Sequence, residues 1–366
     1  MKLALVGVGD AGGRVVNRIR EFENKSNRNF TKGNTLIVNS EPTAFEVAHH
    51  VPENRRLLIG DTHPKVNGGG VDGDLELGVS VAESDRNEIQ RAFDDLEMVD
   101  MDAVLMVAGL GGGTGGGAGA VVLDALTTVF EHPVYVLGLL PTEQEGAESS
   151  LNAARSLRTV VPTADNVLLF DNDAWQDDSS DAEHDYERVN GVLAERVVTV
   201  FAGGEFDVST VAENKLDPSD LMRTLETGGV SSIGFASREV STRGSGLLSW
   251  FRSTDESADP TDAAAIKRLV RQAATSRLTL PCDIESTDRA LVVLSGPPET
   301  LSRKGFEEAR YWLEDAADTV EVLAGDEPRE GASTLTAVVL FSNVTDVPRI
   351  AAIQERGLES RERVVK

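Results

Sequence analysis

The chain has 366 residues, and 40% of them are hydrophobic, which is enough material for two cores. Its 61 Asp and Glu against 35 Lys and Arg give a formal charge of -26 at pH 7, which argues against nucleic-acid or anionic-membrane partners and is typical of a protein from a high-salt cytoplasm. The single cysteine excludes an intramolecular disulfide, no apolar run is long enough to span a bilayer, and no leader precedes the first strand pattern, so we expect a cytoplasmic protein without an integral membrane segment.

The first predicted strand, residues 3–8, leads into a glycine turn and then a helix. Gly7, Gly9 and Gly12 match the pattern G-x-G-x-x-G, in which glycine lets the backbone approach a phosphate at the helix N-terminus. This pattern alone also fits a dinucleotide-binding domain, with Glu41 after the next strand as the ribose acid. An NAD-dependent oxidoreductase is therefore an alternative, although no hydride-transfer residues accompany it.

A second glycine cluster follows the strand predicted at residues 103–108. Residues 109–119 read GLGGGTGGGAG and stand directly before a helical stretch, so backbone N–H groups and the positive end of a helix converge on one anion. A flexible linker is the alternative, but linkers are not usually placed between a buried strand and an amphipathic helix. Two glycine loops in one unit favour a triphosphate held from both sides.

Strand and helix patterns alternate along the first half of the chain. This alternation predicts a doubly wound, mostly parallel sheet of the α/β class. The predicted strands are residues 3–8, 35–39, 56–59, 103–108, 133–140 and 167–170.

The pattern changes in the second half. A largely apolar helix at residues 189–201 is expected to be buried between two domains. Beyond residue 230 glycines become fewer and no phosphate-type loop recurs, which predicts a smaller α+β domain. Its strand patterns are residues 231–236, 290–295, 320–323 and 336–341. We therefore divide the chain into a nucleotide-binding domain, a connecting helix and a C-terminal part, which are residues 1–188, 189–203 and 204–366.

The motifs together resemble those of the tubulin/FtsZ superfamily of polymerising GTPases, whose signature loop reads GGGTG(S/T)G. Residues 111–117 of this chain read GGGTGGG. The acidic composition and the lack of an FtsZ-like linker and tail make the chain most similar to the archaeal CetZ branch. The resemblance covers nearly the whole chain. It implies a GTPase that binds GTP or GDP with Mg²⁺, assembles head to tail with copies of itself and controls cell shape.

The resemblance also implies which residues hold the phosphates and the ribose. Glu145 matches the ribose contact, Asn39 and Ser40 match the loop that contacts nucleotide or magnesium, and Gly70 ends the loop that senses the terminal phosphate. The remaining phosphate residues implied are Gly9, Asp10, Ala11, Gly12, Gly111, Gly112, Gly113, Thr114, Gly115 and Gly116.

Three positions depart from the family pattern. A carboxylate at Asp10 would repel phosphate unless Mg²⁺ lies between them, and the alternative is a helix N-cap. Gly116 lacks the family's hydroxyl, so one phosphate contact is expected to be weaker or supplied by backbone. Ser149 stands where FtsZ has an arginine. These departures keep open a second alternative, a nucleotide-binding scaffold with little turnover.

Base recognition is expected from three side chains. Tyr186 and Asn190 are four residues apart, so a helix presents the ring and the amide on one face. The ring stacks on a purine while Asn172 and Asn190 satisfy its polar edge, a combination that suits guanine. The alternatives are a half-buried aromatic for Tyr186 and a turn residue for Asn172.

Catalysis is expected from residues 214–220, NKLDPSD, which match the family's NxDxxD loop. In that family the loop enters the pocket of the next subunit. Asp217 and Asp220 share a helix face and would polarise the attacking water, while Asn214 helps to position it. As an alternative, Asp217 is a good N-cap before Pro218, and Asp220 a dipole-favoured first-turn acid; capping and catalysis can coexist.

One further segment, residues 241–261, combines Leu247, Leu248, Trp250 and Phe251 with polar residues. The matching region of tubulin makes lateral contacts between protofilaments. This segment is expected either to contact a neighbour, a partner or a membrane, or to fold back on its own domain.

Overall fold

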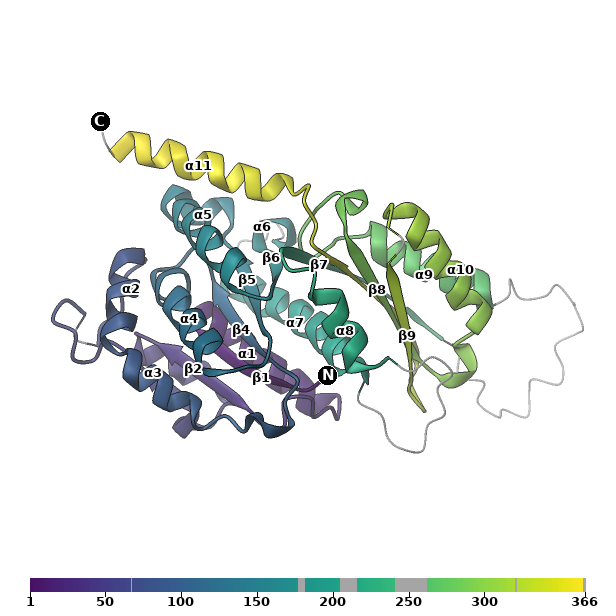
Figure 1. Cartoon of the computed structure of the whole chain (residues 1–366), viewed down its shortest axis with the longest axis horizontal. Coiled ribbons are helices and arrows are strands. Elements are labelled where there is room, and N and C mark those ends of the chain that lie inside the picture. Colours follow the sequence, from purple (N-terminus) through teal and green to yellow (C-terminus); the bar gives the residue numbers. More distant parts are fainter. Residues whose placement is uncertain (67, 177–181, 205–215, 241–261, 320, 365–366) are drawn as a thin grey trace, which may run out of the picture.

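The computed structural model describes residues 1–66, 68–176, 182–204, 216–240, 262–319 and 321–364. Within these residues ten strands form one sheet in the order β3-β2-β1-β4-β5-β6-β7-β10-β8-β9 (Figure 1). Seven of the nine neighbouring pairs are parallel, which confirms the predicted mostly parallel α/β fold. The strands are β1 (Leu3–Val8), β2 (Thr35–Asn39), β3 (Arg56–Leu58), β4 (Ala103–Gly109), β5 (Val134–Leu140), β6 (Asn166–Asp171), β7 (Val230–Glu239), β8 (Arg289–Gly296), β9 (Val322–Pro328) and β10 (Thr334–Ser342).

The strands of the first half are apolar along their length because helices cover both faces of the sheet. In β1, Ala4, Val6 and Val8 pack into one core, and Leu3 and Leu5 pack into the other. The first face is covered by α2 (Leu75–Ser84), α3 (Arg86–Phe93), α4 (Gly119–Val129) and α5 (Gly146–Thr163). The second face is covered by α1 (Gly9–Lys25) and α7 (Ala182–Phe201).

The sheet continues from the first half of the chain into the second. β6 and β7 pair in parallel over a short register in which Val167 faces Val230. β10 then lies antiparallel between β7 and β8. The helices of this half that pack on the two cores are α8 (Pro218–Leu225), α9 (Asp262–Thr275) and α10 (Arg303–Ala316).

Two elements extend furthest beyond their predicted limits. The connecting helix α7 begins at Ala182 rather than at residue 189, because its first turns are polar and the apolar pattern did not include them. β9 runs on through Asp326 and Glu327, which an apolar strand pattern also leaves out. The pattern therefore finds the buried middle of an element more reliably than its polar ends.

The last helix, α11 (Pro348–Val364), returns to the first half of the molecule and packs along α5 (Figure 1). Gly357 lies at this contact, where a Cβ would come 3.1 Å from Cα of Leu151. Part of the segment assigned to the C-terminal unit thus covers the nucleotide-binding half.

No helix in the described ranges is both long and apolar enough to cross a bilayer. The segment 241–261, with its expected lateral or partner contact, lies outside the described residues.

Candidate functional site

A cavity of about 980 Å³ lies at the carboxyl ends of the parallel strands. The sheet order reverses between β1 and β4, and such a switch point is where open α/β sheets bind ligands. The loops after β1, β2, β3, β4, β5 and β6 form its wall together with α1 and α7. The predicted nucleotide residues that line it are Gly9, Asp10, Ala11, Asn39, Gly70, Gly111, Gly112, Gly113, Thr114, Gly115, Glu145, Asn172, Tyr186 and Asn190.

The two glycine loops meet at the floor of this cavity. Gly9 has a φ of +72°, which an L side chain rarely adopts, and a Cβ there would lie 2.9 Å from the backbone nitrogen of Gly115. The first loop therefore needs glycine both for its conformation and for contact with the second loop. The two glycine loops are therefore in direct backbone contact at the cavity wall.

Gly12 and Gly116 are the predicted phosphate residues that do not line the cavity. A Cβ on Gly12 would lie 2.2 Å from the carbonyl oxygen of Val107, so this glycine permits α1 to pack closely on β4. A Cβ on Gly116 would lie 2.5 Å from the carbonyl oxygen of Leu110 and would point towards α5. A hydroxyl at position 116 would not face the cavity, so its absence removes no group from the cavity wall.

Asp10 lies within the first turn of α1, and the N-cap is Val8, which makes no side-chain capping bond. The capping alternative for Asp10 is therefore wrong. Its Oδ1 accepts a hydrogen bond from Nδ2 of Asn39 at 2.8 Å, and Oδ1 of Asn39 accepts one from the backbone N–H of Glu41 at 3.1 Å. These contacts join the loops after β1 and β2 and hold the Asp10 carboxylate at the cavity wall.

The loop after β2 also contacts the signature loop. Oγ of Ser40 lies 2.8 Å from Oγ1 of Thr114, and Ser40 is buried. The short helix that follows begins at Pro42 with Glu41 at its N-cap, so Ser40 is not the capping residue. Its hydroxyl instead fixes the one hydroxyl of the glycine cluster.

The cavity wall suits Mg²⁺ held between protein and phosphate. The described residues contain no group of three or more His, Cys, Asp or Glu that could hold a metal ion by themselves. Magnesium usually takes only one or two carboxylates and completes its shell with phosphate and water. Asp10, Glu41 and Asp72 all line the cavity beside the glycine loops and offer such carboxylates.

The opposite end of the cavity is organised around Glu145. Its Oε1 accepts hydrogen bonds from the backbone N–H of Thr142 at 2.9 Å and from the hydroxyl of Tyr186 at 3.1 Å. Burial, with the nearby Glu145 charge, raises the pKa of Tyr186 to about 12, so the phenol is neutral at physiological pH. Asn190 lines the cavity, as its spacing from Tyr186 along α7 predicts, and Asn172 lines it from the segment that follows β6.

Arg14 also lines the cavity, and the sequence analysis did not single it out. It is exposed and lies on α1 one turn after the glycine turn, so its place in the helix that follows G-x-G-x-x-G was the available signal. Ser149, which stands where FtsZ has an arginine, bonds the carbonyl oxygen of Glu145 instead. Among the described residues, the arginines that line this cavity are Arg14 and Arg18, and both belong to α1.

Asp217 and Asp220 lie at the other edge of the sheet. α7 runs from Tyr186 at the cavity to Phe201, whose carbonyl oxygen accepts a hydrogen bond from the amino group of Met1, just before the amino end of β1. This stretch of helix is ~22 Å long. Leu216, directly before Asp217, lies beside Gly203, which follows α7, since a Cβ on Gly203 would lie 3.1 Å from Cδ2 of Leu216. The two acids are therefore too far away to enter the cavity of their own chain.

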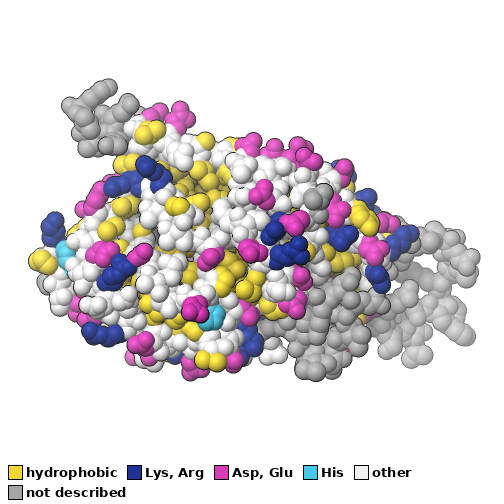
Figure 2. Space-filling model, viewed as in Figure 1, with side chains coloured by type: hydrophobic (Ala, Val, Ile, Leu, Met, Phe, Trp, Pro, Cys, Tyr) yellow, Lys and Arg dark blue, Asp and Glu magenta, His cyan; other side chains and the backbone are white. Residues whose placement is uncertain are grey.

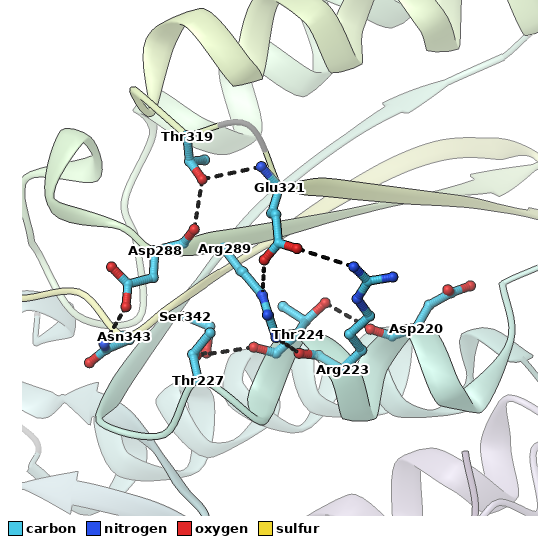
Figure 3. Close-up of polar contacts among 10 residues, drawn as sticks. All are labelled: Asp220, Arg223, Thr224, Thr227, Asp288, Arg289, Thr319, Glu321, Ser342 and Asn343. Carbon is cyan, nitrogen blue, oxygen red and sulfur yellow. Dashed lines mark hydrogen bonds and ion pairs between the residues drawn. The ribbon is translucent and has the colours of Figure 1, made fainter.

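The start of α8 has the capping geometry expected of it. Oδ1 of Asp217 accepts from the backbone N–H of Ser219 at 2.8 Å, which lowers the pKa of Asp217, and Oδ2 of Asp220 accepts from the backbone N–H of Asp217 at 3.2 Å. Figure 3 shows the Asp220 carboxylate directed away from the ion pair between Arg223 and Glu321, which is 3.1 Å long. Asn214 lies outside the described residues.

A doubly wound sheet that carries two glycine loops at its switch point defines a phosphate-binding α/β protein. Comparison with known proteins narrows this class. Residues 2–180 match the GTPase domain of the tubulin/FtsZ family, and residues 179–359 match the C-terminal domain of tubulin-like CetZ. The chain belongs to the tubulin/FtsZ family and, within it, to the CetZ branch. This membership sets aside the oxidoreductase alternative.

Similar proteins come from Haloferax volcanii. Tubulin-like protein CetZ1 is 42% identical over 100% of this chain and 93% of its own length, and CetZ3 is 43% identical over 99% and 92%. The structure of the CetZ1 GDP-bound monomer has a TM-score of 0.86 at 39% identity and covers 99% of this chain and 100% of that one. The CetZ2 GTPγS-bound protofilament has a TM-score of 0.85 at 34% identity and covers both chains fully, 100% of each.

Proposed function

We propose that this chain is a cytoplasmic cytoskeletal protein that polymerises head to tail on GTP, hydrolyses GTP at the junction between subunits and serves cell shape. Membership of a GTPase family supports nucleotide hydrolysis in general. The solved relatives support the nucleotide and the assembly, since one is a GDP-bound monomer and another a GTPγS-bound protofilament. The single observation that carries the proposal is that the cavity and the two acids of α8 lie at opposite edges of one sheet.

In this proposal the cavity binds GTP from both ends. Backbone N–H groups of the two glycine loops bind the phosphates, Gly70 lies beside the terminal phosphate, and Glu145 accepts from the ribose hydroxyls. Tyr186 stacks on guanine, and Asn172 and Asn190 bond its polar edge. Asp10, with Glu41 and Asp72 beside it on the cavity wall, would hold Mg²⁺, which when bound would neutralise phosphate charge.

Hydrolysis needs the acids of the next subunit. Asp220 and Asp217 of one copy accept hydrogen bonds from a water beside the terminal phosphate in the cavity of its neighbour, and Asn214 helps to position that water. A bond forms between the water oxygen and the terminal phosphorus while the bond from that phosphorus to the bridging oxygen of the β-phosphate breaks. The bridging oxygen leaves with GDP, and the protons of the water stay with the released phosphate. Head-to-tail stacking is required because the acids cannot reach the cavity of their own chain.

The test measures phosphate release against protein concentration in concentrated KCl, for the natural chain and for Asp220→Ala. We expect turnover to rise more than linearly with concentration in the natural chain and to be lost in the variant, with GTP affinity unchanged. Added Asp220→Ala copies should also lower the turnover of natural copies, since they enter the same filaments.

Glu226→Ala is the matched control, because Glu226 is an exposed acid at the other end of α8. It should keep turnover. Loss of GTP binding in Asp220→Ala, or full turnover by isolated monomers, would contradict catalysis between subunits. A natural chain that binds GTP and assembles without releasing phosphate would instead favour the scaffold alternative. The serine at position 149, where FtsZ has an arginine, is the feature that favours this alternative.

A further inference from the structure

Two buried side chains of α5 contact two loops of the cavity, the loop of Gly70 and Gly73 and the signature loop of residues 109–119. Asn152 and Ser156 are four residues apart, so they share the inner face of the helix, and both are almost fully buried. Nδ2 of Asn152 donates to the carbonyl oxygen of Gly73 at 2.8 Å and to that of Gly111 at 3.1 Å. One amide therefore joins the loop beside the expected terminal phosphate to the signature loop.

Ser156 holds the signature loop at a second place. Its Oγ lies 3.1 Å from the carbonyl oxygens of both Leu110 and Gly116, which share its single hydrogen. A Cβ on Gly116 would lie 2.6 Å from this Oγ. The serine hydroxyl thus occupies the space into which a side chain at position 116 would extend.

The signature loop is also held by Ser40, which contacts Thr114, and by close packing of Gly113 and Gly117 on the backbone of α2. Gly111, Gly112 and Gly113 have no side chains, and glycine loses more conformational freedom on ordering than any other residue. The loops touch chiefly through backbone, since a Cβ on Gly113 would lie 2.8 Å from the carbonyl oxygen of Asp74. Hydrogen bonds from α5 are the side-chain contacts that set their separation.

We propose that Asn152 and Ser156 are positioning residues. Asn152 holds the loop of Gly73 and the signature loop at the separation a triphosphate requires. Ser156 holds the signature loop and supplies from α5 the hydroxyl that the family signature carries at position 116. This inference rests on the proposed GTP site. Asn152 acts on the terminal phosphate through the loop of Gly73, so its loss weakens GTP binding more than GDP binding. Ser156 acts on the signature loop alone, so its loss weakens both.

The test titrates GTPγS and GDP into dilute, unassembled protein in concentrated KCl. Asn152→Ala should lower GTPγS affinity about tenfold, as expected for two lost hydrogen bonds, and GDP affinity clearly less. Asn152→Leu keeps the volume without the donors and should lower the GTPγS-to-GDP affinity ratio in the same way, so that a folding defect of the alanine variant leaves the question decidable.

Asn166→Ala is the matched control. Asn166 is also a buried amide that bridges two carbonyl oxygens, those of Leu225 at 3.0 Å and Gly228 at 2.9 Å, but at the opposite edge of the sheet. It should lower the stability of the fold and leave the affinity ratio unchanged. An unchanged ratio in both Asn152 variants would overturn the role of Asn152.

The role of Ser156 is tested by moving its hydroxyl. Gly116→Ser alone should weaken binding of both nucleotides because its Cβ meets both the carbonyl oxygen of Leu110 and Oγ of Ser156. Ser156→Gly alone should weaken binding because the loop loses its donor. The double variant keeps the contact with Leu110 but loses the contact with Ser156, so its loss of affinity should be smaller than the sum of the two single losses. Strictly additive losses of affinity would overturn the idea that Ser156 replaces the hydroxyl of position 116. A natural chain that binds neither nucleotide would instead refute the proposed function itself.

Discussion

At the scale of single residues, Tyr186 contributes both an aromatic ring and a hydroxyl to the cavity. Its hydroxyl donates to Glu145 and its ring lines the cavity. Stacking of a base on an aromatic ring contributes ~1–3 kcal/mol, so Tyr186→Ala should weaken GTP binding by roughly tenfold or more. Tyr186→Phe keeps the ring and loses one hydrogen bond worth ~1 kcal/mol, so its effect should be smaller. Nucleotide titration of the two variants checks this order, and equal losses would contradict stacking.

The same residue gives an expectation for pH. Burial and the Glu145 charge raise the pKa of Tyr186 to about 12 in the folded chain. A raised pKa means that the folded state favours the neutral phenol, so this contribution to stability is complete below the ordinary tyrosine pKa and is lost as pH rises through about 12. Tyr186 should therefore stay neutral at the pH at which an exposed tyrosine begins to ionise. A titration of GTP affinity against pH should show no loss from this side chain until the pH approaches about 12.

Side-chain direction limits what the sequence predicts at this scale. The four-residue spacing of Tyr186 and Asn190 places both on one helix face, and both line the cavity. A run of glycines offers no comparable guide, because the pattern does not say which way each Cα faces. Gly116 is assigned to the phosphates for this reason, and its neighbour Ser156 is missed because they are far apart in the chain.

At the scale of elements, α11 reaches across to the loops of the cavity through Arg349. This side chain is 10% exposed; its Nη2 donates to the carbonyl oxygen of Pro141 at 2.8 Å, and its Nε donates to Oδ1 of Asp171 at 3.0 Å. Pro141 lines the cavity, and Asp171 immediately precedes Asn172, which also does. The C-terminal helix is therefore tied to the end of the cavity that holds Pro141 and Asn172.

Removal of this contact has a predictable cost. Arg349→Ala leaves the Asp171 carboxylate buried without its guanidinium, a change that typically costs 3–5 kcal/mol. Burial already raises the pKa of Asp171, with Arg349 opposing the shift. The destabilisation relative to the natural chain should therefore be smallest at acid pH, where the carboxyl is protonated, and should grow as pH rises. Denaturant unfolding at several pH values measures this.

Arg356→Ala is the control on the same helix. Arg356 pairs with the exposed Glu143 at 3.3 Å, and an exposed pair contributes ~0–1 kcal/mol. A loss as large as that of Arg349→Ala would mean that the whole helix, rather than one buried pair, had been disturbed. GTP affinity should fall in the Arg349 variant alone.

Strands are the elements that the sequence predicts best. β1 and β2 have the bounds expected of them because strands buried on both faces are uninterrupted apolar runs. The sequence does not predict the docking of α11 on α5, because most residues of α11 are polar. One of its apolar residues, Leu358, is in fact 65% exposed. Which helix covers which depends on tertiary packing that periodicity does not contain.

At the scale of the whole molecule, two ends face opposite ways along one sheet, with the cavity at one and the acids of α8 at the other. Fold and family follow from motif order in the sequence, whereas this separation depends on the sheet that joins the two halves. Figure 2 shows carboxylates spread across the visible face, among the basic groups rather than in one patch. Copies that approach one another therefore repel through their net charge rather than through a single acidic patch on this face.

Charge sets the last prediction. Each copy has a formal charge of -26, and repulsion between copies extends over a Debye length of ~10 Å at 0.1 M salt but only ~3 Å at 1 M. With GTP present, assembly followed by light scattering should therefore fail in dilute buffer and appear in concentrated KCl. Sucrose of equal osmolality changes water activity without screening and should not replace KCl, while circular dichroism at each salt concentration separates lost assembly from lost folding. Brisk polymerisation of folded protein in dilute buffer would show that screening does not control assembly.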